Sequence, residues 1–66
     1  MSVTPKEKEV LQLLAGGMSS KQIAEKLTIS FHTVEGYRKS LRQKFGARNV
    51  AEVITKAYRL LVIQIV

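Results

Sequence analysis

The fold of this chain is decided between Ser30 and Arg48, a stretch that reads SFHTVEGYRKSLRQKFGAR. At about 100° per residue, its apolar positions gather on one narrow arc of a helix. They are Val34, Tyr37, Leu41 and Phe45. The opposite arc holds polar residues and one glycine: His32, Glu35, Gly36, Lys39 and Gln43. One side of this helix therefore belongs to a core, and the other side meets a partner.

The charge of the same stretch indicates what that partner is. Lys39 is accompanied by further basic residues, against the single acid Glu35. They are Arg38, Arg42, Lys44 and Arg48. The whole chain has a formal net charge of +6 in 66 residues, and most of the excess lies after residue 33. Such a field attracts polyanions.

Composition excludes several classes of function. The chain has no cysteine and one histidine, so it lacks the ligands for a disulfide framework, a thiolate metal site or a zinc site. No pair of carboxylates suggests an active site, and we expect no enzyme, no metal and no cofactor. No apolar run approaches the roughly 20 residues that span a bilayer, and the N-terminus does not resemble a signal peptide. A single soluble, cytoplasmic domain without membrane contact is expected.

Helix start and stop signals predict four helices, at about residues 5–15, 20–27, 31–45 and 50–61, with no strand. Thr4 and Glu7 form a capping box around the first, and Ser19 and Gln22 form one before the second. Gly16 and Gly17 should end the first helix in left-handed conformations. Two further caps and one terminating glycine complete the pattern: Ser30, Asn49 and Gly46. The predicted fold class is an all-α, compact four-helix domain.

A short helix, a tight turn and a longer basic helix is the layout of helix-turn-helix modules. Within that class, residues 3 to about 60 resemble the LuxR-type (GerE, FixJ, NarL) DNA-binding domain. The resemblance is carried by TPKE at 4–7, EVL at 9–11, Gly17, SK at 20–21, IA at 23–24, Leu27, Ser30, TVE at 33–35, Lys44, Gly46 and RN at 48–49.

The resemblance implies one helix-turn-helix domain over residues 1–66, without a wing. It implies sequence-specific binding of double-stranded DNA for transcription regulation, with residues 20–27 and 31–45 as the reading unit. Residues 50–61 would then form a homodimer that matches a two-fold operator. Such domains are usually the output domains of response regulators or of autoinducer receptors. The first case is favoured, and it implies an upstream receiver domain in the full-length protein. RNA polymerase is a further candidate partner.

Three sets of candidate residues follow. The base-reading candidates lie on the polar arc: His32, Glu35, Gly36, Lys39 and Gln43. The phosphate-contacting candidates are Ser20, Lys21, Thr33, Tyr37, Arg38, Arg42, Lys44 and Arg48. The dimer candidates are Val50, Val53, Ile54, Ala57 and Leu61. They are expected to divide between the core and, as the resemblance implies, a symmetric dimer contact, and the alternative is that all of them fill one core. The C-terminal third has more apolar surface than three small helices can easily cover, which favours the dimer.

Several of these residues have a second interpretation. A mid-helix glycine costs about 1 kcal/mol relative to alanine, so Gly36 implies either close approach to DNA or tight helix packing. Glu35 could accept from a cytosine amino group or pair with Lys39 four residues on. Ser20 could serve only as a cap, and His32 could hold a phosphate or face solvent. Packing is the favoured interpretation of Tyr37.

Two other readings of the whole chain compete. A basic helical module could dock a protein partner or an anionic membrane surface, in which case basic residues should flank an apolar stripe that faces the ligand. A sigma-factor-like or other helix-turn-helix regulator is a nearer alternative. The flanks TPKE at 4–7 and ARN at 47–49 favour the LuxR type.

Overall fold

The computed structural model describes residues 2–60 and places four helices there, with no strand. They are α1 (Pro5–Ala15), α2 (Ser20–Leu27), α3 (Phe31–Phe45) and α4 (Val50–Arg59). The predicted bounds of the first three are confirmed. The fourth ends at Arg59 with Leu60 as its cap, earlier than predicted, and Leu61 lies outside the described residues. No helix of residues 2–60 is long and apolar enough to cross a membrane.

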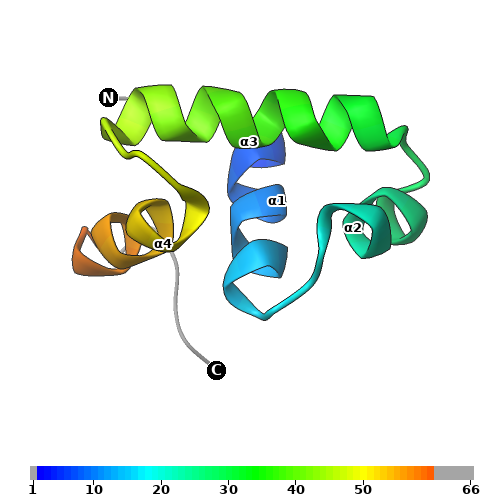
Figure 1. The fold of residues 1–66 in the computed structure, drawn as a ribbon, viewed down its shortest axis with the longest axis horizontal. Helices are drawn as coiled ribbons and strands as arrows, with labels where there is room; N and C mark the ends of the chain where they lie inside the picture. Colours follow the sequence, from blue (N-terminus) through cyan, green and yellow to red (C-terminus); the bar gives the residue numbers. More distant parts are fainter. Residues whose placement is uncertain (1, 61–66) are drawn as a thin grey trace.

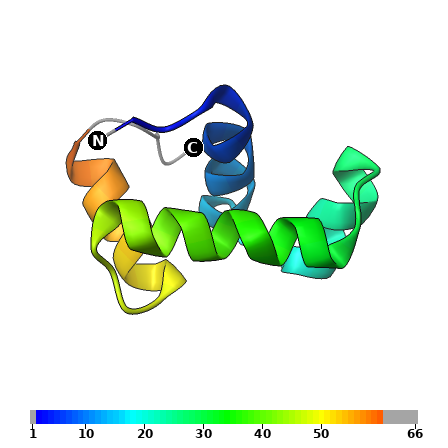
Figure 2. The same cartoon turned by 90° about the horizontal axis from the view of Figure 1, so that it is seen from above.

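Helix α3 is the longest element and lies across the other three (Figure 1). α1 runs beneath its middle, with α2 under one end and α4 under the other (Figures 1 and 2). α1 and α3 each contact all other helices, whereas α2 and α4 do not contact each other. The side of α3 that faces away from α1 is therefore not covered by another helix.

The helix starts are fixed by side-chain caps, as predicted. Thr4 Oγ1 accepts from the backbone N–H of Glu7 at 3.1 Å, and the Thr4 N–H donates to Glu7 Oε1 at 2.9 Å. Ser19 and Gln22 form the same reciprocal pair, at 3.2 and 2.9 Å. The single caps at α3 and α4 are also present, because Ser30 Oγ accepts from the Thr33 N–H and Asn49 Oδ1 accepts from the Glu52 N–H. These bonds satisfy backbone donors that a helix start leaves without partners.

The ends of α1 and α2 show one wrong prediction and one feature that was not predicted. Gly17 (φ +95°) and Gly46 (φ +60°) take left-handed conformations, but Gly16 is right-handed (φ −78°), so the prediction for Gly16 is wrong. Thr28 ends α2 with φ +56°, a conformation that costs a β-branched residue roughly 1–2 kcal/mol. The turn of the helix-turn-helix unit thus contains a strained threonine that no sequence signal indicated.

Every helix contributes to one core. Its buried apolar residues are Val10, Leu11, Leu14, Ile23, Ala24, Val34, Leu41, Phe45, Val53 and Ala57. The apolar arc of α3 is confirmed for Val34, Leu41 and Phe45, while Tyr37 is only partly buried and packs against the core. Because this arc is covered by the core, it cannot be the ligand-facing stripe that the docking-module alternative requires.

One carboxylate is buried beside this core. The Glu7 side chain is 5% exposed, and its Oε1 lies 2.6 Å from Nζ of Lys44. Ser40 Oγ donates to its Oε2 at 2.6 Å. Although burial raises the pKa of Glu7, the hydrogen bonds from Lys44, Ser40 and Thr4 lower it from 4.5 to about 2. The start of α1 is thus tied to the second half of α3 by an ionised carboxylate with all its partners in place.

Replacing Lys44 with Met should lower the free energy of unfolding at pH 7 by about 2–4 kcal/mol, because it leaves a buried carboxylate without its cation. The folded pKa of Glu7 lies below the unfolded value of 4.5, so its contribution is complete above pH 4.5 and is lost as pH falls towards 2. Urea unfolding at several pH values should therefore show the wild type and Lys44→Met converging in acid. A difference between them that is the same at every pH would contradict this account.

Candidate nucleic-acid interface

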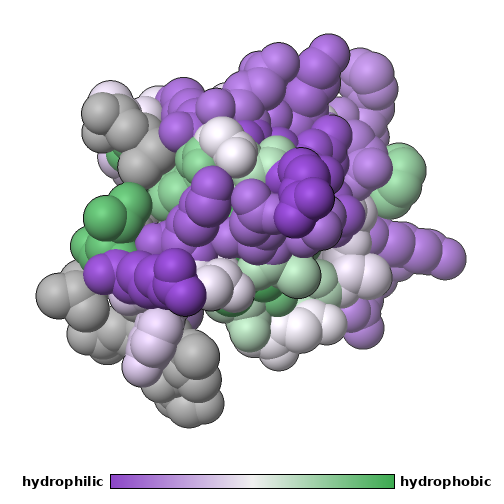
Figure 3. Space-filling model, turned by 60° about the vertical axis from the view of Figure 1, so that its left-hand side comes forward, coloured by the Kyte–Doolittle hydropathy of each residue, from purple (hydrophilic) through white to green (hydrophobic). Residues whose placement is uncertain are grey.

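The polar arc of α3 is exposed as predicted. Its exposed members include His32, Glu35, Gly36, Lys39 and Gln43. Figure 3 shows hydrophilic residues along the upper part of the molecule, where α3 lies. We call His32, Gly36, Lys39 and Gln43 the reading face. Within residues 2–60, Lys39 forms no ion pair or hydrogen bond, so its ammonium group is available to a ligand.

Gly36 lies at the middle of the reading face. A Cβ placed on this glycine would meet nothing within 4 Å. Tight packing against another helix therefore does not explain why a residue that weakens the helix stands there. Of the two explanations left open by the sequence, close approach of a partner outside the described residues remains.

Glu35 connects the two helices of the reading unit. Its Oε2 accepts a hydrogen bond from Ser20 Oγ of α2 at 2.6 Å. The same oxygen lies 3.3 Å from Nε of Arg38, which is buried and, lacking hydrogen-bond alignment, contributes charge alone. Glu35 thus pairs with Arg38 rather than with Lys39. Its side chain is 45% exposed, and its carboxylate holds α2 against α3.

Three predicted phosphate contacts are engaged inside the domain. Arg38 is paired with Glu35. Ser20 is buried, with its hydroxyl donated to Glu35. Lys44 is paired with Glu7. We therefore revise the predicted set and remove these three residues. The sequence did not show the pairings of Ser20 and Lys44, because the partners are 15 and 37 residues apart along the chain.

The remaining polar candidates surround the reading face. Lys21 and Thr33 are exposed, and the Thr33 hydroxyl shares a hydrogen bond with that of Ser30 at 2.8 Å. Arg42 is partly exposed. Arg48 has a side chain that is 90% exposed even though its Nε lies 3.4 Å from Glu52. An aromatic residue that the sequence did not single out, Phe31, is 55% exposed at the first position of α3.

The dimer candidates on α4 separate into two groups. Val53 and Ala57 are 1% and 0% exposed and lie in the core, so their prediction as interface residues is wrong. Helical spacing alone could not divide a broad apolar helix between its two sides. Val50 and Ile54 are partly exposed, and Tyr58, four residues further on, is 47% exposed. We call Val50, Ile54 and Tyr58 the α4 stripe.

Comparison with known proteins agrees with this geometry. The family model described as GerE, bacterial regulatory proteins of the luxR family, matches residues 1–57. The transcriptional regulatory protein MctR of Rhizobium johnstonii is 42% identical over 83% of this chain and 26% of its own length. The chain spans about a quarter of the length of the curated relatives that it matches.

Two solved structures have the same fold. The response regulator ChrA of a heme-sensing two-component system is 35% identical, with a TM-score of 0.91 over 96% of this chain and 31% of that one. VqmA of Vibrio cholerae, in a complex with ligand and DNA, is 40% identical, with a TM-score of 0.88 over 94% of this chain and 27% of that one. The chain therefore belongs to the LuxR family of bacterial regulatory proteins, as a helix-turn-helix domain for DNA-binding transcription regulation.

Proposed function

We propose that α3 enters the major groove of an operator with its reading face towards the base edges. The observation that carries this proposal is Gly36, an exposed mid-helix glycine with open space around it. A helix without a side chain at this point brings its backbone closer to the groove floor. Lys39 and Gln43, three and seven residues further along α3, then reach the base edges, where lysine donates to guanine and glutamine pairs with adenine.

We further propose that three exposed or partly exposed basic residues bind phosphates on both sides of the groove. They are Lys21 at the start of α2, Arg42 on α3 and Arg48 after it, and the uncharged Thr33 in the first turn of α3 adds a hydrogen bond. If about three phosphates are neutralised per domain, the logarithm of the affinity should fall with the logarithm of salt concentration with a slope of about −2.7. These contacts supply affinity, and the reading face supplies sequence choice.

The α4 stripe is proposed to pair with that of a second copy. A two-fold contact places two α3 helices side by side, as a two-fold operator requires. A single exposed stripe of Val50, Ile54 and Tyr58 is small compared with stable interfaces of about 1,200–2,000 Å², so we expect the isolated domain to pair mainly on DNA.

The rest of the protein is also a matter of proposal. ChrA is a response regulator of a two-component system, and we propose that an upstream receiver domain controls this domain. The full-length regulator then acts in the cytoplasm on chromosomal DNA. RNA polymerase is proposed as the protein partner that responds when the regulator is bound to DNA.

Replacing Lys39 with Ala should weaken binding to a duplex selected by this chain from a random library by about 1–3 kcal/mol, as expected for a lost base contact. The loss on an unselected duplex should be much smaller. Lys8→Ala removes the same charge from the exposed side of α1 and is the matched control. Equal losses on both duplexes would make Lys39 a phosphate contact instead.

Replacing Gly36 with Ala should have opposite effects on the two states. It should raise the free energy of unfolding of the unbound domain by about 0.5–1 kcal/mol, since no neighbour obstructs a methyl group. It should weaken binding to the selected duplex. Thermal unfolding and fluorescence anisotropy measure the two effects. Greater stability together with undiminished DNA binding would show that the backbone of α3 does not approach the groove at this point.

Replacing Tyr58 with Glu should disrupt pairing without disturbing the core, because this side chain is 47% exposed. Binding to a duplex with two half-sites should weaken by about tenfold or more, while binding to one half-site should change little. A parallel mobility-shift titration of the two duplexes measures the difference. Equal effects on both would place the dimer contact elsewhere.

A further inference from the structure

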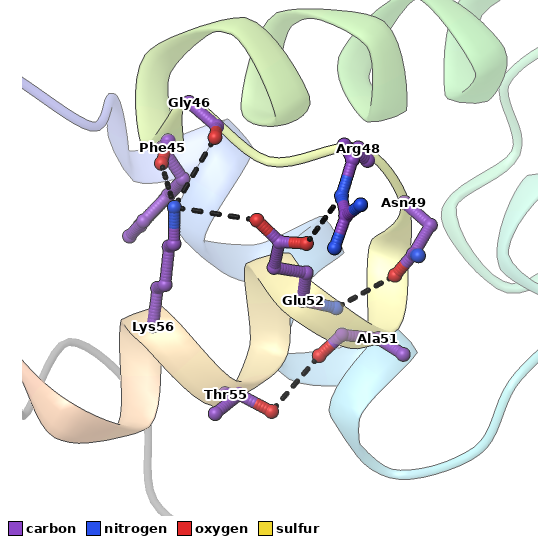
Figure 4. Close-up of polar contacts among 8 residues, drawn as sticks. All are labelled: Phe45, Gly46, Arg48, Asn49, Ala51, Glu52, Thr55 and Lys56. Atoms are coloured by element: carbon purple, nitrogen blue, oxygen red, sulfur yellow. Dashed lines mark hydrogen bonds and ion pairs between the residues drawn. The ribbon is translucent and has the colours of Figure 1, made fainter.

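A lysine of α4 caps the end of α3 (Figure 4). Lys56 Nζ donates to the carbonyl oxygens of Phe45, at 3.2 Å, and Gly46, at 3.1 Å. Phe45 is the last residue of α3 and Gly46 is its C-cap. Carbonyls at a helix end lack partners within the helix, and a cation there also faces the negative end of the helix dipole. The ammonium group thus joins two helices that are connected in sequence by only four residues, 46–49.

The same ammonium group is also contacted by a carboxylate of its own helix. Glu52 Oε1 lies 3.3 Å from Lys56 Nζ, and Oε2 lies 3.4 Å from Nε of Arg48 in the connection (Figure 4). The backbone N–H of Glu52 donates to the Asn49 cap at 2.8 Å. An ammonium group has three protons, and here it faces three acceptors. Polar contacts therefore hold both ends of the connection at 46–49.

These contacts can control the orientation of α3, because a small rotation at one end of a long helix displaces its other end by a large distance. Its 15 residues span about 22 Å. A rotation of roughly 10° at the end next to α4 would move the other end of α3 by about 4 Å, more than the ~3.4 Å rise of one base pair. Apolar packing between α3 and α4 is non-directional, whereas hydrogen bonds to two carbonyls are directional.

We propose that Lys56 is a positioning residue, which fixes the angle between α3 and α4 and so sets the spacing of the two half-sites. It acts through the end of α3 rather than through contact with DNA. The inference rests on the proposed pairing through the α4 stripe. The polar contacts of Lys56 are partly exposed, since 40% of its side chain is accessible. The domain should therefore remain folded without them.

The test is a selection from a duplex library with a long random segment, in which the measured quantity is the distribution of spacings between paired half-sites. Lys56→Met keeps the apolar stem and removes the ammonium group. Lys8→Met makes the same change on the exposed side of α1 and lowers the net charge of +6 by the same unit. The wild type and Lys8→Met should select one spacing, and Lys56→Met should spread over about two or three neighbouring spacings.

Affinities give a second readout. On the duplex selected by the wild type, Lys56→Met should bind about 3- to 10-fold more weakly, while its binding to a single half-site should stay within about twofold. A loss of folding would lower both equally, and thermal unfolding checks for it. If Lys56→Met does not fold, Lys56→Gln serves in the same comparison and should also broaden the spacing.

Two results would overturn the inference, and they differ. If the wild type selects one spacing and folded Lys56→Met selects it just as sharply, Lys56 does not set the angle, while the dimer proposal stands. If the wild type itself selects isolated half-sites without a preferred spacing, pairing through α4 fails and the role of Lys56 fails with it.

Discussion

The buried carboxylate of Glu7 is the constraint on which the rest of the structure depends. It caps α1 through Thr4 and receives Ser40 and Lys44 from α3, so it fixes the longest helix on the first one. Leaving such a charge without partners would cost several kcal/mol. With α3 held in this way, its apolar arc is covered and its polar arc faces solvent. The surface that can meet a ligand follows from how α3 is anchored.

The anchoring also divides the basic residues into two groups. Lys44, Arg38 and Lys56 are used within the domain, by Glu7, by Glu35 and by the end of α3. Lys39 on the reading face and Arg48 in the connection after α3 are exposed. Glu7, Glu35 and Glu52 therefore pair with cations that are used within the domain, whereas Lys39 has no ion pair within residues 2–60. That arrangement suits a domain that must attract DNA and still choose among sequences.

Local features of the fold were predictable, and tertiary contacts were not. Helix starts were predicted correctly because Thr4, Ser19 and Ser30 act on residues three positions away. The faces of α3 were predicted because its periodicity is strict. The contact of Glu7 with Lys44 joins residues 37 positions apart, and no sequence pattern predicts it. Because α4 is apolar over a broad part of its surface, its sequence did not distinguish core positions from exposed ones. Val53 was therefore wrongly assigned to the dimer interface. The family resemblance predicted which helices carry the function but could not show which charges were already paired.

The most direct test of the account is to map the amides and side-chain amide groups of the ¹⁵N-labelled chain on titration with a duplex that it has selected. The account predicts that the largest chemical-shift changes fall on His32, Gly36, Lys39 and Gln43, with smaller changes at Lys21 and Arg48. Val34 and Leu41, on the covered side of α3, should change little. Large changes confined to α4 or α1, with the reading face undisturbed, would contradict it.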